Sequence, residues 1–113
     1  MAKFLALYKG FASEAEKAAT VVSSDVQAQG MAAWGQWMAQ HATKILDGGG
    51  PLGATLKASP DGISTSRNDL TGYIIIEAES HVEAAQLFEK HPHFAIFPGD
   101  SVEIIECIPI PGM

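Results

Sequence analysis

Short apolar runs alternate with amphipathic stretches along the chain, and this pattern predicts four strands and three helices. Runs of β-branched and aromatic residues favour strands, and a serine three residues before a glutamate or glutamine favours the start of a helix. The expected strands cover residues 4–8, 54–59, 72–78 and 101–108. The expected helices cover residues 13–22, 24–46 and 80–90, with capping serines at Ser13, Ser24 and Ser80.

Glycine and proline separate these elements. Three glycines and a proline follow Asp47, and this composition predicts the end of the long helix. The sequence Pro60-Asp61-Gly62 predicts a turn, after which residues 63–70 form either a second hairpin strand or a loop. The resulting order, β–(αα)–β–β–α–β, predicts an α+β fold. We expect a ferredoxin-like βαββαβ plait with a split first helix and a four-stranded antiparallel sheet, in one domain spanning residues 1–113.

The last strand predicts that both faces of the sheet are covered. One face carries Val102, Ile104, Glu106 and Ile108, and the other carries Glu103, Ile105 and Cys107, so both faces are mostly apolar. Helices cover only one face of such a sheet, so the other needs cover from outside the chain. Charged residues make up 18% of the sequence, below the roughly 25% of ordinary domains. We therefore expect a homodimer in which two sheets pack face to face.

Charge and composition exclude several classes of partner. The chain has 7 Lys+Arg and 13 Asp+Glu, a formal net charge of −6, so we expect it to bind neither nucleic acid nor an anionic membrane surface. No apolar run approaches the roughly 18 residues that a membrane span needs. A single cysteine, Cys107, excludes an internal disulfide. Together these features predict a cytoplasmic protein.

His41 lies in the middle of the apolar stripe of the long predicted helix, on the same side as Trp34, Met38 and Ile45. A histidine there is either a core or interface residue bonded to a backbone carbonyl, or a general acid or base that faces a pocket. Trp34 and Trp37 likewise either belong to the core or line an apolar pocket for a flat organic ligand.

The loops contain further candidates. His91 and His93 are two residues apart, but no third ligand follows at a recognisable spacing, so we expect no metal site. One of these histidines is a candidate ligand contact at the mouth of a barrel. Arg67 either binds a substrate carboxylate or belongs to a solvated hairpin.

Several segments, in this order, resemble the YCII-related (DGPF-like) family of the dimeric α+β barrel superfamily. They are residues 34–38, Gly48-Gly49, Pro51-Leu52, residues 71–80, Ala84-Ala85, His91-Pro92 and residues 102–104. The resemblance implies a homodimer with a small pocket in each protomer, between sheet and helices. It also implies elimination of small groups from ring compounds by a His–Asp pair. This chain has Trp37 where the resemblance places that histidine, and residues 66–70 where it places the DGPF segment.

The resemblance and the position of His41 together predict a cofactor-independent enzyme that acts by proton transfer, as in elimination or isomerisation, on a small cyclic organic compound. His41 is the expected acid or base, Asp47 or Asp69 the orienting carboxylate, and Trp34, Trp37 and Tyr73 the pocket lining. A non-catalytic small-molecule-binding or interaction module is the alternative, and a purely structural dimer is the third.

Overall fold

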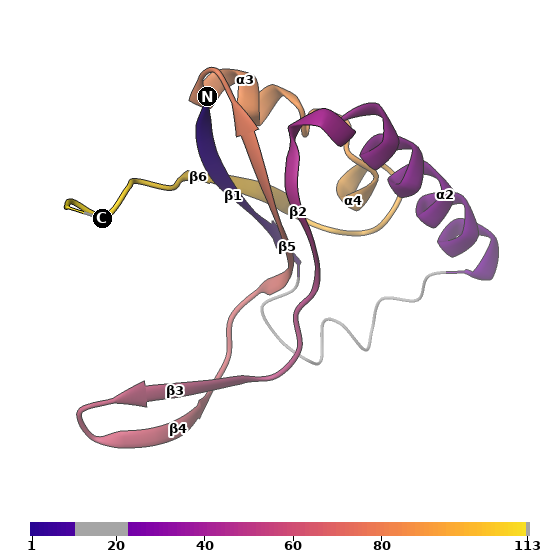
Figure 1. Ribbon diagram of the computed structural model, residues 1–113. Helices are drawn as coiled ribbons and strands as arrows, with labels where there is room; N and C mark the ends of the chain where they lie inside the picture. The colour runs from indigo at the N-terminus through magenta and orange to yellow at the C-terminus, as the bar shows by residue number, and fades with distance from the viewer. Residues whose placement is uncertain (11–22, 113) are drawn as a thin grey trace.

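The computed structural model describes residues 1–10 and 23–112, and four of its strands form one antiparallel sheet (Figure 1). These strands are β1 (Ala2–Lys9), β2 (Ile45–Pro51), β5 (Leu70–Ala78) and β6 (Ser101–Glu106), in the spatial order β2-β5-β1-β6. Strand β1 therefore lies between the two strands that come last in the chain. This arrangement is compatible with the predicted ferredoxin-like α+β fold.

The helices lie together on one side of the sheet (Figure 1). They are α2 (Ser24–Gln40), the short 3₁₀ helix η1 (Ala42–Lys44), α3 (His81–Gln86) and α4 (Pro92–Ala95). Ser80 caps α3 as predicted, since its hydroxyl accepts the N–H of Glu83. The cap of α2 is Ser23, one residue before the predicted one, and it accepts the N–H of Val26. No helix in the described part of the chain is both long and apolar enough to cross a membrane.

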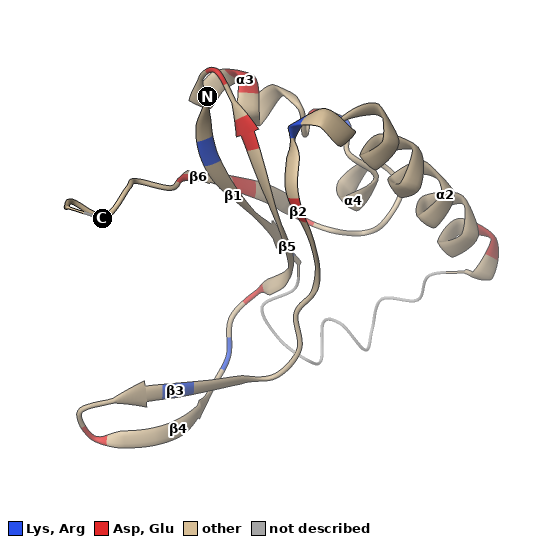
Figure 2. Ribbon diagram, in the orientation of Figure 1, with Lys and Arg blue, Asp and Glu red and all other residues tan. Residues whose placement is uncertain are grey.

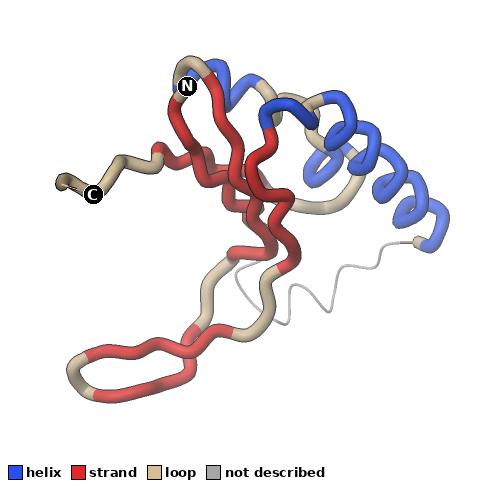
Figure 3. Tube along the Cα trace, in the orientation of Figure 1, coloured by secondary structure: helices blue, strands red, loops and turns tan. Residues whose placement is uncertain are grey.

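The second strand of the main sheet corrects the prediction. The segment expected to end the long helix is strand β2, and α2 stops at Gln40. Backbone pairing with β5 overrides the low strand propensity of its glycines, and register shifts on both sides of Asp47 accommodate them. Residues 54–59, expected in the sheet, contribute instead β3 (Thr55–Ser59), which pairs only with β4 (Gly62–Ser66). Figure 3 shows this hairpin projecting from the body of the protein.

Other boundaries differ less. The predicted helix over residues 13–22 lies outside the described residues. The helix expected to reach Lys90 ends at Gln86 and continues as turns, and the loop expected over residues 91–100 contains α4. Strand β6 ends at Glu106, two residues earlier than expected.

The core lies between the inner face of the sheet and the helices. Alternate residues of β1 and β5 point inward and are buried, and Trp37, Ala84 and Phe88 pack on them from the helix side. The other face carries Leu5, which pairs with Ile75 on one side and with Ile105 on the other. Ile105 is 45% exposed, so this apolar face has no full cover within the described chain.

Charged side chains are unevenly distributed. Helix α2 carries only Asp25, at its first turn, and the rest of its length is neutral (Figure 2). Its other exposed positions hold neutral residues, mostly alanine, glutamine and glycine, with one serine and one methionine. The scarcity of charged residues on α2 therefore accounts for part of the low content of charged residues in the chain.

Candidate functional site

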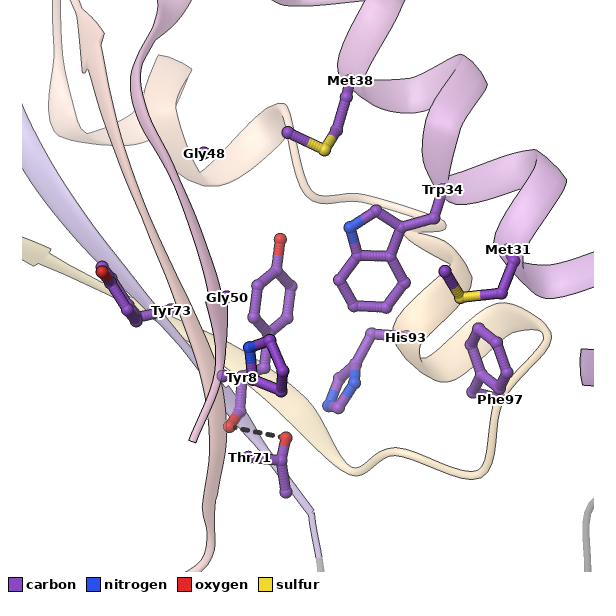
Figure 4. Close-up of a pocket in the computed structure, with 12 residues that line it drawn as sticks. Tyr8, Met31, Trp34, Met38, Gly48, Gly50, Thr71, Tyr73, His93 and Phe97 are labelled. Carbon is purple, nitrogen blue, oxygen red and sulfur yellow. Dashed lines mark hydrogen bonds between the residues drawn. The ribbon is translucent and has the colours of Figure 1, made fainter. Parts of the chain in front are cut away.

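A cavity of about 500 Å³ lies between the inner face of the sheet and α2 (Figure 4). Its volume is within the range of about 300–1,000 Å³ that is typical of small-molecule sites. Most of its walls are aromatic rings, methionines and glycine backbone. The lining residues are Tyr8, Met31, Trp34, Met38, Gly48, Gly50, Pro51, Thr71, Gly72, Tyr73, His93 and Phe97.

Glycines create the sheet side of this cavity. Gly48 and Gly50 of β2 line it and add no side chain. Between them, Gly49 has φ 64°, and a Cβ atom there would collide with the carbonyl oxygen of Tyr73, so only glycine fits. On β5, a Cβ atom at Gly72 would lie 3.3 Å from Cδ2 of Tyr8. The glycine run predicted as a helix stop is therefore a cavity wall.

Tyr8 is the last inward-facing residue of β1 and is only 4% exposed. Its hydroxyl points into the cavity, toward the side where Trp34 and Met38 lie (Figure 4). Burial raises the pKa of the Tyr8 phenol well above its usual value. The group therefore stays protonated at neutral pH and can donate a hydrogen bond.

His91 lies behind Tyr8 and is fully buried. Its Nδ1 accepts the backbone N–H of His93 at 3.0 Å, and its Nε2 lies 3.3 Å from the hydroxyl oxygen of Tyr8. Trp34 and Trp37 enclose the ring, with centroids 4.5 and 4.6 Å away. Burial lowers the pKa of His91 to about 4, and repulsion from His93 and His41 adds to this shift. His91 is therefore neutral at neutral pH.

His93 lines the cavity beside Tyr8, with their ring centroids 5.2 Å apart. Its Nε2 donates a hydrogen bond to the carbonyl oxygen of Lys9 at 2.7 Å. A neutral ring that donates from Nε2 has its lone pair on Nδ1, which is the nitrogen left to take a proton. A Cβ atom at Gly99 would collide with this ring, so the following loop packs tightly against it. His93 is thus held in place by backbone on two sides.

The two tryptophans have different surroundings. The Trp34 indole lines the cavity, with its centroid 4.9 Å from that of Tyr8. Trp37 is buried in the core, does not line the cavity, and donates from Nε1 to the carbonyl oxygen of Leu87 at 2.8 Å. Tyr73 borders the cavity, but its ring lies on the opposite side of the sheet from Tyr8 (Figure 4).

The structure does not bring the predicted catalytic residues together. His41 is the C-cap of α2, packs on Trp37 at 4.9 Å between ring centroids, and borders a separate surface hollow. The Asp47 carboxylate accepts the N–H of Gly49, and Asp69 pairs with Lys9 at 3.5 Å. A site built on His41 therefore stays a prediction. Arg67 is exposed after β4 and does not line the cavity.

Metal ligands do not cluster in the part of the chain that the structure describes, where no group of three or more His, Cys, Asp or Glu side chains is placed to hold an ion. His91 and His93 do not converge on one point. Both ring nitrogens of His91 are in hydrogen bonds, and one nitrogen of His93 bonds to backbone.

Sequence reasoning missed Tyr8 and the glycine wall. The available signal for Tyr8 was its place in the alternation of β1, where Phe4, Ala6 and Tyr8 share the buried face. A hydroxyl at the end of a buried apolar row needs a partner or a ligand. The prediction of a helix and its stop over residues 45–51 concealed strand β2, whose glycines line the cavity together with Tyr8.

Comparison with known proteins adds a structural neighbour. No protein-family model matches the chain, and no curated protein matches it. Among solved structures, the chain is similar to 5-chloro-2-hydroxyhydroquinone dehydrochlorinase (TftG) from Burkholderia phenoliruptrix AC1100, in a complex with 2,5-dihydroxybenzoquinone. The TM-score is 0.51 and the identity 22%, over 90% of this chain and 89% of that chain. The likeness shows a shared α+β fold.

Proposed function

We propose that this protein is an enzyme that catalyses proton transfer, as in elimination or isomerisation, on a small planar cyclic compound without a cofactor. The observation that carries the proposal is the cavity of about 500 Å³, in which the phenol ring of Tyr8 and the imidazole ring of His93 lie side by side, with centroids 5.2 Å apart, among apolar walls. A flat ring suits these walls, because Trp34, Met31 and Met38 provide polarisable surface on the helix side.

The two polar groups have complementary roles. Nδ1 of His93 accepts a proton from a hydroxyl or carbon of the substrate ring, and the released electron pair forms a new double bond. In an elimination, the leaving group departs with its own electron pair, so the ring loses H⁺ and an anion and no oxidant is required. The Tyr8 hydroxyl donates to the ring oxygen on which negative charge develops.

The structural neighbour supports the same class of chemistry. TftG is named as a dehydrochlorinase of a chlorinated hydroxyhydroquinone, and its structure contains a dihydroxybenzoquinone. The fold of this chain therefore also occurs in an enzyme that eliminates a small group from a ring compound. We include the YCII-related family resemblance and a cytoplasmic location in this proposal.

Halide release tests the proposal directly. The purified protein is incubated with chlorinated hydroquinones and hydroxyhydroquinones, and chloride and the quinone product are measured. We expect turnover that His93→Gln and Tyr8→Phe each reduce at least tenfold, and that Lys57→Ala in the hairpin leaves unchanged. Binding of 2,5-dihydroxybenzoquinone is measured in parallel by calorimetry.

The possible outcomes separate the candidate functions. Binding without release of a leaving group indicates a small-molecule-binding module and overturns the catalytic part. If the protein shows neither binding nor turnover, the whole proposal is overturned. His41→Ala tests the rival centre: if it abolishes turnover while His93→Gln does not, the acid or base is His41.

We also propose a homodimer formed through the outer face of the sheet. On this face Leu5 lies between Ile75 and Ile105 in adjacent strands, which makes a continuous apolar row. Contiguous apolar surface of this kind is typical of protein interfaces. Two copies packed on these faces would bury the row, whereas the cavity lies between the opposite face of the sheet and α2.

A further inference from the structure

His91 is the polar side chain in direct contact with Tyr8 that does not itself line the cavity. It is 0% exposed, and both of its ring nitrogens are in hydrogen bonds. Its position in the sequence, 83 residues after Tyr8, shows that the contact depends on the whole fold.

The backbone determines which nitrogen of His91 carries the proton. The amide of His93 can only donate, and it lies 3.0 Å from Nδ1, so Nδ1 must be the acceptor. In a neutral imidazole the proton is then on Nε2. The proton on Nε2 faces the Tyr8 oxygen 3.3 Å away, so the phenol accepts a hydrogen bond from His91.

In this arrangement the hydroxyl hydrogen of Tyr8 is not donated to His91. The hydroxyl points into the cavity (Figure 4). We infer that His91 is a positioning residue that makes Tyr8 a hydrogen-bond donor toward the cavity, so that the ligand atom at this point is an acceptor, such as a ring carbonyl or an oxyanion. This inference rests on the proposed function only for the identity of the ligand.

The surroundings of His91 keep the arrangement fixed. Its ring packs among Trp34, Trp37 and Phe88, with centroids 4.5, 4.6 and 5.7 Å away. The titratable groups that act on His91 are Tyr8, His93 and His41. None of them carries a negative charge at neutral pH, so none of them can stabilise an imidazolium there. A second proton on the ring, which would displace the amide of His93, is therefore disfavoured.

Nitrogen-15 NMR of the histidine-labelled protein tests the tautomer itself. We expect His91 to show a protonated Nε2 and an unprotonated Nδ1 throughout pH 5–8, and to give a proton-detected correlation from Nε2. A protonated Nδ1, or a ring that titrates near neutral pH, would overturn the inference whatever the protein binds.

Two substitutions at His91 test its action on Tyr8. Glutamine can place its amide nitrogen near the position of Nε2 and retain a donor to Tyr8, whereas asparagine is too short to reach it. We expect His91→Asn and Tyr8→Phe each to weaken binding of 2,5-dihydroxybenzoquinone about threefold to tenfold, the effect of one lost hydrogen bond. We expect the affinity of His91→Gln for this probe to stay within about twofold of that of the wild type. Circular dichroism checks that each variant is folded.

The outcomes are distinct from those of the proposed function. If folded His91→Asn binds the probe like the wild type, the inference is wrong even though the cavity binds quinones. If the wild type does not bind the probe, the proposed function fails, and the NMR spectrum alone decides the inference. If His91→Asn does not fold, the decision rests on the tautomer together with Tyr8→Phe and His91→Gln.

Discussion

The Nε2 atom of His91 lies 3.3 Å from the hydroxyl oxygen of Tyr8, and this contact joins the first strand to the segment that precedes the last. Both residues are buried, so each polar group depends on the other in place of water. The contact links the stability of the interior to the chemistry of the cavity.

Removing the Tyr8 hydroxyl should destabilise the fold as well as weaken ligand binding. In Tyr8→Phe the ring packing remains, but the Nε2–H of His91 loses its acceptor. We expect the free energy of unfolding to fall by about 1–3 kcal/mol, the usual cost of an unsatisfied buried group. Urea denaturation measures it. Tyr73→Phe is the matched control, because the Tyr73 ring lies on the opposite side of the sheet (Figure 4); an equal loss in both variants would contradict the assignment.

Stability should decrease as the pH falls from neutral. The folded pKa of His91 is about 4, below its ordinary value of 6.5, so the unfolded chain takes up a proton that the folded protein does not. The stabilisation linked to the lowered pKa of His91 is present in full above about pH 6.5. It is lost as the pH falls toward 4, and the total loss in the free energy of unfolding is about 3 kcal/mol.

Urea unfolding at pH 7.0, 5.5 and 4.5 measures this loss. His91→Gln removes the titrating group while retaining a donor, so its free energy of unfolding should vary less with pH than that of the wild type. Carboxylates and the other histidines contribute equally to the pH dependence of stability in both proteins. The difference between the two pH dependences therefore gives the contribution of His91. Parallel curves for the two proteins would show that His91 does not titrate as described.

The two neighbouring glycines Gly49 and Gly50 should respond differently to alanine. At Gly49 the added methyl group meets the Tyr73 carbonyl oxygen and the backbone has φ 64°, so we expect a loss of at least about 2 kcal/mol. At Gly50 no atom lies within 4 Å of the new Cβ, so stability should be unchanged or slightly higher. Thermal unfolding of both variants checks this, and similar melting temperatures would be inconsistent with the strand geometry.

A charge on the outer sheet face should prevent dimer formation. Ile75 lies at one end of the apolar row, next to Leu5, and Ile75→Glu would place a carboxylate within the proposed interface. Sedimentation should give twice the chain mass of 12.0 kDa for the wild type and a single chain for the variant. Leu56→Glu, on the exposed hairpin, should leave the dimer intact. A monomeric wild type at micromolar concentration would contradict the proposed interface.

Local signals predicted the parts of the fold in which backbone propensity and burial agree. The run from Tyr73 to Ala78 combines β-branched residues with burial, and Ser80 caps the next helix through its own side chain. Strand β2 was missed because its glycines form a strand only through pairing with β5, which no local pattern reveals. Tertiary contact overrides local preference there.

The candidate site was predictable to a similar degree. Trp34 and His93 were singled out by residue type and position, and both line the cavity. His41 shares the helix stripe of Trp34, but α2 ends at Gln40 and His41 falls outside the cavity. Tyr8 was missed because its role depends on His91, and a contact across 83 residues leaves no trace in spacing.

The strand order has a consequence for how the protein is made. Strand β1 is synthesised first, but its two neighbours, β5 and β6, leave the ribosome last. Both edges of β1 therefore lack their native partners until most of the chain exists, and contacts so distant in sequence are slow to form. Tyr8 and His93 come together only when α4 has packed against this sheet. A ligand of the cavity would therefore bind only the completely folded protein and would stabilise only that state.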